Sequence, residues 1–157
     1  MKLTTLCYIV KEGKTLLLHR IKKQNDENAG KWIGIGGKLE AGESPEDCVK
    51  REVTEETGLT LISPVFRGII TFVSDIYGTE YMFLFTCSDF SGELAENCDE
   101  GVLKWVDDRE LDSLPMWEGD RIFFELLKSR KDFFSLKLNY NGDTLVGASL
   151  DGDAMSI

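Results

Sequence analysis

Residues 37–59 read GKLEAGESPEDCVKREVTEETGL, and the later part of this stretch carries the clearest helix signal in the chain. Ser44 is a favourable N-cap residue, Pro45 fits the first helical position, and Asp47 lies three residues after the cap, as in a capping box. Gly58 is typical of the position just after a helix, where the backbone turns left-handed. The stretch therefore predicts a helix that begins after Ser44 and ends before Gly58.

Three glutamates lie on one side of this predicted helix. Glu52, Glu55 and Glu56 are spaced at i, i+3 and i+4, which places them within one arc of about 100°. Like charges at this spacing destabilise an exposed helix by roughly 0.2–0.5 kcal/mol per pair. A hard divalent cation relieves that repulsion, and carboxylate oxygens are the ligands that Mg²⁺ and Mn²⁺ favour. For the helix taken alone, a solvated acidic face is the alternative interpretation.

The residues before this helix extend the pattern. Gly37 is followed after five residues by Glu43, and seven residues later the chain reads REVTEETGL from 51 to 59. This spacing matches every position of the Nudix signature, and chance would produce such a match on the order of once in a billion windows. The chain therefore resembles the Nudix hydrolase superfamily. The resemblance implies the Nudix fold and hydrolysis of a nucleoside diphosphate linked to another group.

The resemblance also implies a site for Mg²⁺ or Mn²⁺, built from the signature carboxylates and a backbone carbonyl of the glycine turn. The implied metal ligands are Gly36, Glu52, Glu55, Glu56 and Glu100. The last of these precedes a later strand, and its neighbours Glu96 and Asp99 could take its place. The implied catalytic residues are Arg51, Glu52, Glu55, Glu56 and Glu100.

The catalytic roles follow from the chemistry of these side chains. Arg51 can pair with Glu55, four residues further on, and orient that carboxylate by a charge-assisted hydrogen bond. Bound metal would neutralise pyrophosphate oxygens while water attacks phosphorus in line. As the general base we rank Glu55 first, then Glu100, then Glu52.

Segments outside the signature indicate the substrate. Residues 31–38, KWIGIGGK, are similar to the approach strand of the MutT-like 8-oxo-dGTP diphosphatases, and residues 115–120, PMWEGD, to the base-recognition segment of mammalian-type oxidised-purine triphosphatases. The resemblance implies that Trp117 stacks on the base and Asp120 hydrogen-bonds a purine edge. The residues expected to contact the substrate are Lys23, Trp32, Ile33, Lys38, Trp117 and Asp120. Packing in the core is the alternative for both tryptophans.

Two departures from those enzymes bear on selectivity. Ile33 stands where they usually offer an asparagine amide to the base, and Gly119 stands where the mammalian type has a second aspartate. A site that lacks a hydrogen-bond partner loses discrimination. Strict 8-oxo-dGTP selectivity therefore does not follow, and a broader purine triphosphate or another capped diphosphate stays open. The reaction that the resemblance implies is Mg²⁺-dependent cleavage of a nucleoside triphosphate, 8-oxo-dGTP or a related purine, to the monophosphate and pyrophosphate.

Length and patterning indicate one domain. The chain has 157 residues, of which 42% are hydrophobic and 29% charged, enough for one ordinary core. Apolar and β-branched runs alternate with two main helical segments, the second over 118–130, so we expect an α/β fold with a mixed β-sheet sandwiched between helices. Asn141-Gly142 predicts a type I′ hairpin turn. We assign 1–149 to a single Nudix domain and expect 150–157 to fray.

Charge and composition limit the partners. The formal net charge is −10, yet residues 1–42 hold 8 basic and 4 acidic residues. So acidic a chain does not track duplex nucleic acid by general attraction, whereas a small polyanion held through bound cations suits it. No apolar run approaches the ~20 residues that span a bilayer, and the N-terminus lacks a secretory signal. We expect a cytoplasmic monomer or homodimer that binds a nucleotide, with mostly buried free thiols at its four cysteines.

Two alternative functions stay open at this point. One is a Nudix hydrolase of another nucleoside diphosphate derivative, such as ADP-ribose, a dinucleotide or a capped RNA end. The other is a catalytically silent nucleotide sensor on the same fold, although the complete set of signature glutamates argues against it.

Overall fold

The computed structural model describes residues 1–22 and 26–157. Its strands are β1 (Lys2–Lys11), β2 (Lys14–His19), β3 (Trp32–Ile33), β4 (Thr60–Ile62), β5 (Val65–Ser74), β6 (Gly78–Cys87), β7 (Asp89–Ser91), β8 (Asn97–Cys98), β9 (Gly101–Asp107), β10 (Phe134–Asn141), β11 (Thr144–Leu150) and β12 (Asp153–Met155). Its helices are α1 (Pro45–Thr57), α2 (Glu118–Ser129) and the 3-10 helix η1 (Asp108–Ser113).

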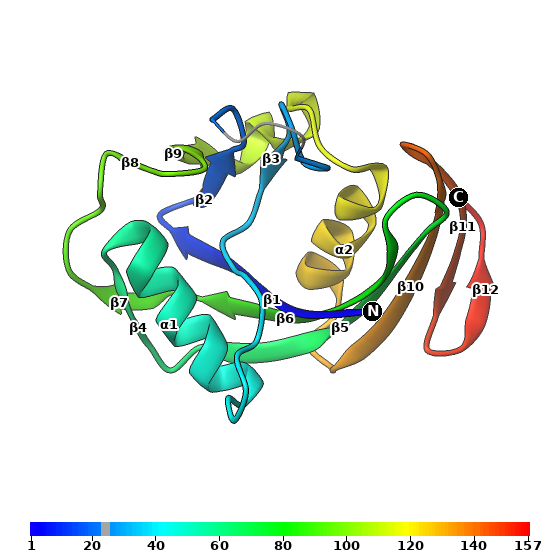
Figure 1. Ribbon diagram of the computed structural model, residues 1–157, viewed down its shortest axis with the longest axis horizontal. Helices are drawn as coiled ribbons and strands as arrows, with labels where there is room; N and C mark the ends of the chain where they lie inside the picture. The colour runs from blue at the N-terminus through cyan, green and yellow to red at the C-terminus, as the bar shows by residue number, and fades with distance from the viewer. Residues whose placement is uncertain (23–25) are drawn as a thin grey trace.

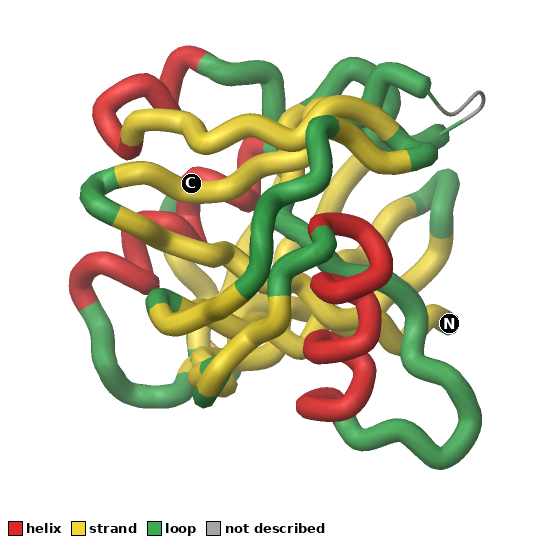
Figure 2. Tube along the Cα trace, turned by 90° about the vertical axis from the view of Figure 1, so that its left-hand side faces the viewer, coloured by secondary structure: helices red, strands yellow, loops and turns green. Residues whose placement is uncertain are grey.

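One large mixed sheet organises the fold (Figure 1). Its strands follow the order β12-β11-β10-β5-β6-β1-β2-β9-β8, with β3 beside β2. β1 pairs with β6 in parallel, as β5 does with β10, whereas β5 and β6 are antiparallel. In Figure 2 the red helices lie outside the yellow strands. The structure therefore confirms the predicted α/β class with its mixed sheet.

The core is divided by β1, whose successive side chains point to opposite faces of the sheet. Cys7 and Ile9 pack with Val49 and Val53 of α1 in one buried cluster. Tyr8 belongs to a second cluster, which includes Phe123 of α2 and the inward residues of β5 and β10. The two helices thus cover different faces of the sheet, and the even-numbered residues of β1 face the side of α2.

The helix predicted from the signature is confirmed as α1. The Ser44 backbone N–H donates to Asp47 Oδ2 at 3.1 Å, and the Asp47 N–H donates to Ser44 Oγ at 3.0 Å, which completes the capping box. Gly58 ends the helix with φ 78°. This local chemistry fixes both ends of α1 and therefore the register of its glutamates.

The hairpin between β10 and β11 is confirmed, but its predicted turn type is wrong. Asn141 pairs with Thr144, so Gly142 and Asp143 are the two turn residues. Gly142 has φ 60°, and neither Asn141 nor Asp143 has a positive φ. A type II′ turn needs positive φ only at its first central residue. A register shift between Asn139 and Tyr140 accompanies this change.

The C-terminal stretch 150–157, expected to fray, instead contains β12. Leu150 pairs with Asp153 and Ala148 with Met155 across a two-residue turn. Asp151 and Gly152 have φ of 50° and 91°, as a type I′ turn requires. This Asp-Gly pair was the sequence signal for the strand.

Several short elements were also not predicted. They are the small two-stranded sheet of β4 and β7, the short strand β8 within the acidic loop, and η1 after β9. In the ranges that the structure describes, each helix is too short or too polar to span a bilayer.

Candidate active site

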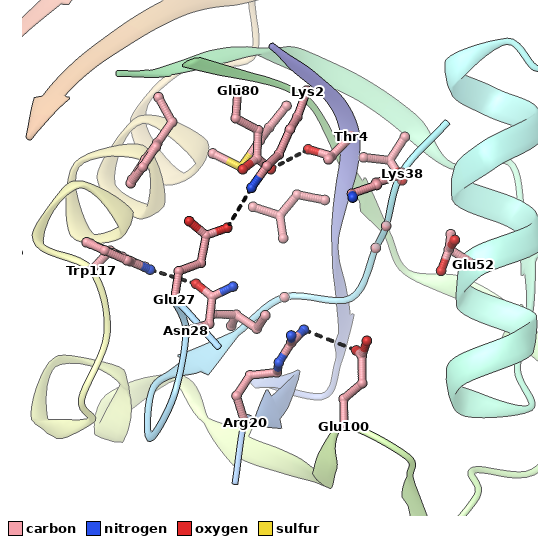
Figure 3. Close-up of a pocket in the computed structure, with 18 of the residues that line it drawn as sticks. Lys2, Thr4, Arg20, Glu27, Asn28, Lys38, Glu52, Glu80, Glu100 and Trp117 are labelled. Carbon is pink, nitrogen blue, oxygen red and sulfur yellow. Dashed lines mark hydrogen bonds and ion pairs between the residues drawn. The ribbon is translucent and has the colours of Figure 1, made fainter. Parts of the chain in front are cut away.

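A pocket of about 610 Å³ lies between the glutamate face of α1 and the start of α2. Figure 3 shows Glu52 of α1 on one side and Trp117 on the other, with β1 running between them in this view. The expected site residues that line it are Gly36, Glu52, Glu56, Glu100, Ile33, Lys38, Trp117 and Asp120. The fold therefore brings most of the predicted metal and substrate residues to one cavity.

Of the carboxylates on the α1 side of the pocket, Glu56 has the most strongly shifted pKa. Burial, followed by the charges of Glu100 and Glu52, raises the pKa of Glu56 to about 8. Its Oε2 is shielded from solvent and has no hydrogen-bond partner among the described residues. An unsatisfied buried carboxylate oxygen costs about 1–3 kcal/mol or more. A cation held at this oxygen would compensate both the missing partner and the repulsion between the carboxylates.

Glu52 is held against the glycine turn. Arg51 Nη1 donates to Glu52 Oε1 at 2.8 Å, and burial raises the Glu52 pKa. A Cβ atom added at Gly37 would overlap the Glu52 carboxylate, whereas one added at Gly36 would overlap the backbone carbonyl of Thr5. The glycine turn thus lies directly between β1 and the glutamate face of α1.

The turn itself is extended along β1. Thr5 N–H donates to the Gly37 carbonyl at 2.9 Å, and Cys7 N–H donates to the Ile35 carbonyl at 2.7 Å. Gly36 lies between Ile35 and Gly37 in the chain and lines the pocket. Its carbonyl accepts no backbone hydrogen bond from the described part of the chain. The Gly36 carbonyl is therefore available as a further oxygen ligand.

Arg51 lies outside the pocket and joins the signature loop to α1. It reaches Glu55 Oε2 at 3.2 Å, as predicted, but its shorter contacts are a bidentate pair with Glu43 at 2.7 and 2.9 Å. This pairing lowers the pKa of Glu43 to about 2. Arg51 also donates to the Lys38 carbonyl at 3.1 Å. Arg51 therefore fixes the loop that carries Lys38 and Glu43 against helix α1.

The structure does not bring Glu55 to the pocket. Its side chain is 59% exposed, paired with Arg51, and absent from the pocket wall. Among residues 1–22 and 26–157, no three His, Cys, Asp or Glu side chains are close enough together to hold a metal ion as they stand. Metal binding would therefore require rotation of carboxylates that already share this wall, chiefly Glu52, Glu56 and Glu100.

Glu100, and not Glu96 or Asp99, is the loop carboxylate that lines the pocket. Arg20 Nη1 donates to Glu100 Oε2 at 3.1 Å, and Arg20 Nε donates to Asp26 Oδ2 at 2.7 Å. Arg20 therefore connects Glu100, on the α1 side, to the 26–28 segment near Trp117.

Trp117 packs in the core, as the alternative interpretation has it, and it also lines the pocket, so its stacking on a base stays a prediction. It is 5% exposed and meets Phe72 and Tyr140 edge to face, with ring centroids 5.2 and 5.0 Å away. Its indole Nε1 donates to Asn28 Oδ1 at 2.7 Å. Asp120, one helical turn on, is buried, and burial raises its pKa to about 8.

Of the other residues expected to contact the substrate, Trp32 is not placed in the pocket. Trp32 is outside its wall and stacks on His19, with centroids 4.3 Å apart and planes 6° from parallel. Its packing contacts follow from its place on β3 beside β2. Lys23 lies outside the described residues.

The packing around Gly119 accounts for its lack of a side chain. Its N–H donates to the Tyr140 hydroxyl at 2.7 Å. A Cβ atom here would overlap a methyl group of Leu138 and lie 2.8 Å from that hydroxyl. A second aspartate at this position would require Leu138 and Tyr140 to move.

Sequence reasoning missed a polar group at the pocket wall. Thr4 Oγ1 donates to Glu80 Oε2 at 2.7 Å, and Lys2 Nζ lies 3.4 Å from Glu27 Oε1. These residues and Asn28 line the pocket (Figure 3). The alternation of β1, with Lys2 and Thr4 on the face of Tyr8, was the available signal for two of them.

Comparison with known proteins agrees with this geometry. The NUDIX domain family matches residues 2–127. The Bacillus subtilis (strain 168) protein named uncharacterized Nudix hydrolase YvcI is 36% identical over 120 residues, which cover 74% of this chain and 72% of that protein. An oxidized purine nucleoside triphosphate hydrolase of Danio rerio is 36% identical over 152 residues, covering 96% and 94% respectively.

A solved structure gives the same assignment at the level of the fold. The crystal structure of a MutT protein from Bacillus halodurans matches with a TM-score of 0.86 at 32% identity, and the match covers 98% of this chain and 99% of that one. With the signature helix, glycine turn and carboxylates in place, the chain belongs to the Nudix family, in its MutT-like branch, and is a hydrolase of phosphorus-containing anhydrides.

Proposed function

We propose that the protein is a divalent-metal-dependent pyrophosphohydrolase that converts a purine nucleoside triphosphate to the monophosphate and pyrophosphate, with 8-oxo-dGTP as the first candidate. The observation that carries the proposal is the buried Glu56 oxygen, which has no hydrogen-bond partner in the part of the chain that the structure describes and lies in the same pocket as Trp117 and Asp120. One side of that pocket suits a cation and phosphates, and the other suits a planar base. The Danio rerio relative, by its name, supports this substrate class.

The donor set suits Mg²⁺ or Mn²⁺, since its members are hard oxygen ligands. The groups that would hold the metal are the Gly36 carbonyl and the carboxylates of Glu52, Glu56 and Glu100. When bound, the metal supplies neutralisation of pyrophosphate charge and a lowered pKa for attacking water. Glu55, on the exposed side of α1, is proposed to act through Arg51 rather than as a ligand.

The chain's own residues would divide the remaining work by position. Lys38 lines the pocket next to the glycine turn and is proposed to contact phosphate oxygens. Of the three candidates for general base, Glu52 and Glu100 line the pocket. Glu100 is 31% exposed, so it can pass a proton on to solvent, and we assign it the role of accepting the proton from water.

The base would enter between Trp117 and the β1–β6 wall. Phe72 and Tyr140 hold the Trp117 ring edge to face, so its orientation is fixed before a nucleotide binds. Asp120 is proposed to bind the purine edge from the first turn of α2. Since nucleotide pools are intracellular, we propose a cytoplasmic location.

The test is a panel of normal and oxidised nucleoside triphosphates, together with ADP-ribose, assayed in Mg²⁺ and in EDTA. We expect metal-dependent release of pyrophosphate from purine triphosphates. The Glu56→Gln variant should lose at least a hundredfold in kcat while keeping its thermal stability. Glu46→Gln, an exposed position on the same helix, is the matched control.

Other results would contradict the proposal. Release of two monophosphates from ADP-ribose, with no pyrophosphate from any triphosphate, would assign the protein to another Nudix reaction. Binding without turnover would indicate a nucleotide sensor. Turnover by Glu56→Gln within threefold of wild type would show that the buried carboxylate is not part of the metal site.

A further inference from the structure

We infer that Asn28 is a specificity-determining residue that presents an amide hydrogen-bond donor to the purine base, and so selects a 6-oxo purine over a 6-amino purine. The inference rests on the proposed function, because it concerns which base the same pocket accepts. Asn28 lines the pocket between Trp117 and Arg20 (Figure 3).

The indole of Trp117 determines which way the Asn28 amide points. An indole N–H can only donate, so the Asn28 atom 2.7 Å from Trp117 Nε1 must be the carbonyl oxygen. The NH₂ group is therefore turned away from Trp117. In Figure 3 this nitrogen points into the pocket, and no described residue accepts a hydrogen bond from it. A base bound in the pocket would therefore face a hydrogen-bond donor, and not an acceptor, at the Asn28 side chain.

The segment that carries Asn28 is itself restrained. Asn28 N–H donates to Asp26 Oδ1 at 3.2 Å, and its carbonyl accepts from Lys31 N–H at 2.9 Å. Asp26 is in turn paired with Arg20 at 2.7 Å, with side chains only 5% and 11% exposed. A donor on such a fixed segment discriminates better than one on a flexible loop, since less ordering is needed when the base binds.

Among the described residues that line the pocket, Asn28 is the one that has an amide side chain to offer to the base. Ile33, where the resembling enzymes usually offer an asparagine amide, is apolar here and lines the pocket. Asp120 supplies oxygen atoms from the opposite element. The edge of a 6-oxo purine offers O6 as an acceptor, whether or not position 8 is oxidised, whereas a 6-amino purine has a donor in its place. The fixed donor of Asn28 therefore favours the 6-oxo base.

Reversal of this preference is the sharpest test. Asn28→Asp places an acceptor where the NH₂ group was and still accepts from Trp117. The measurement is the ratio of kcat/KM for dGTP to that for dATP, because repulsion of the triphosphate by the new charge is common to both substrates. We expect the ratio to fall about tenfold or more in Asn28→Asp, and less in Asn28→Ala. Asn141→Asp, at the exposed end of β10 and outside the pocket wall, is the control of equal charge and should leave the ratio unchanged.

A second measurement does not need turnover. The ratio of the dissociation constants of dGMP and dAMP, measured in EDTA by isothermal titration calorimetry, should shift most in Asn28→Asp and less in Asn28→Ala. Trp117→Phe keeps an aromatic ring but removes the indole N–H that orients the Asn28 amide, so the ratio of the two dissociation constants should move toward one. The thermal stability of each variant is checked as a control. Ratios within twofold of wild type in both Asn28 variants, with activity retained, would overturn the inference alone. Absence of triphosphate turnover in the wild type would instead overturn the proposed function.

Discussion

Gly36 and Gly37 are adjacent, but their missing side chains leave room for different neighbours. A Cβ atom on Gly36 would overlap the Thr5 carbonyl, which is part of the β1 backbone and cannot move independently. A Cβ atom on Gly37 would overlap the Glu52 carboxylate, the end of a flexible side chain. The first glycine is therefore needed for the pairing of the turn with β1, and the second for the position of a candidate ligand.

Substitution by alanine should separate these two effects. Gly37→Ala should keep its melting temperature within about 3 °C of wild type, because Glu52 can rotate away, but lose about a hundredfold in kcat through that displacement. Gly36→Ala should lose about 1–3 kcal/mol of unfolding free energy, because backbone must shift. Thermal melts and steady-state kinetics on both variants check this. Equal stability losses with equal activities would contradict it.

At the scale of elements, predictions succeeded where local chemistry determines the structure. The boundaries of α1 follow from Ser44, Pro45 and Gly58, and the β10–β11 hairpin follows from Asn141-Gly142. The short strands β4 and β7 have no such signal. Each is three residues long, and they form only by pairing with each other across about thirty residues of chain.

The same distinction applies to the site: residues grouped within one segment could be predicted, and contacts between distant segments could not. The signature residues and Trp117 were identified because their spacing lies within single segments. Asn28 was missed because its contact with Trp117 joins residues 89 positions apart in the chain. Glu55 was expected in the pocket because helical spacing groups it with Glu56, but that spacing does not determine which edge of the arc the fold covers.

Helix α2 begins with a buried acid, which gives it a pH-dependent stability. Asp120 lies in the first turn, where the helix dipole favours negative charge. Burial nevertheless dominates and raises its pKa from 3.8 to about 8. The folded state therefore binds this proton more tightly than the unfolded chain. The stability associated with it is greatest below pH 3.8 and declines as the pH rises toward 8.

Asp120→Asn removes this titration. The unfolding free energy of the variant minus that of the wild type should therefore increase by roughly 2–4 kcal/mol between pH 5 and pH 8. Urea unfolding of both proteins in the same series of buffers gives this difference, and the contributions of all other groups cancel in it. A difference that stays constant with pH would show that Asp120 ionises freely in the folded protein.

For the whole molecule, the charge distribution leaves the folded state under strain that cations can relieve. The net charge is −10, and burial followed by the charges of Glu100 and Glu52 raises the pKa of Glu56 in the pocket. Two kinds of cation effect are then expected. General screening by any salt weakens the repulsion between surface charges over a Debye length of about 10 Å at 0.1 M. A site-bound divalent ion acts only where oxygen ligands converge.

Thermal melts should separate these effects. At a Mg²⁺ or Mn²⁺ concentration about 100-fold above its dissociation constant, binding to the folded state adds about 2.7 kcal/mol, or roughly 5–10 °C in melting temperature. Sodium chloride at the same ionic strength should give only the smaller screening effect. Glu56→Gln should abolish the excess due to the divalent ion while it keeps the response to sodium chloride, and Glu46→Gln should keep both. Within the described pocket, the Glu56 oxygen is the buried side-chain oxygen that has no hydrogen-bond partner. If the additional stabilisation by the divalent ion persisted in Glu56→Gln, the ion would therefore be bound elsewhere on the acidic surface.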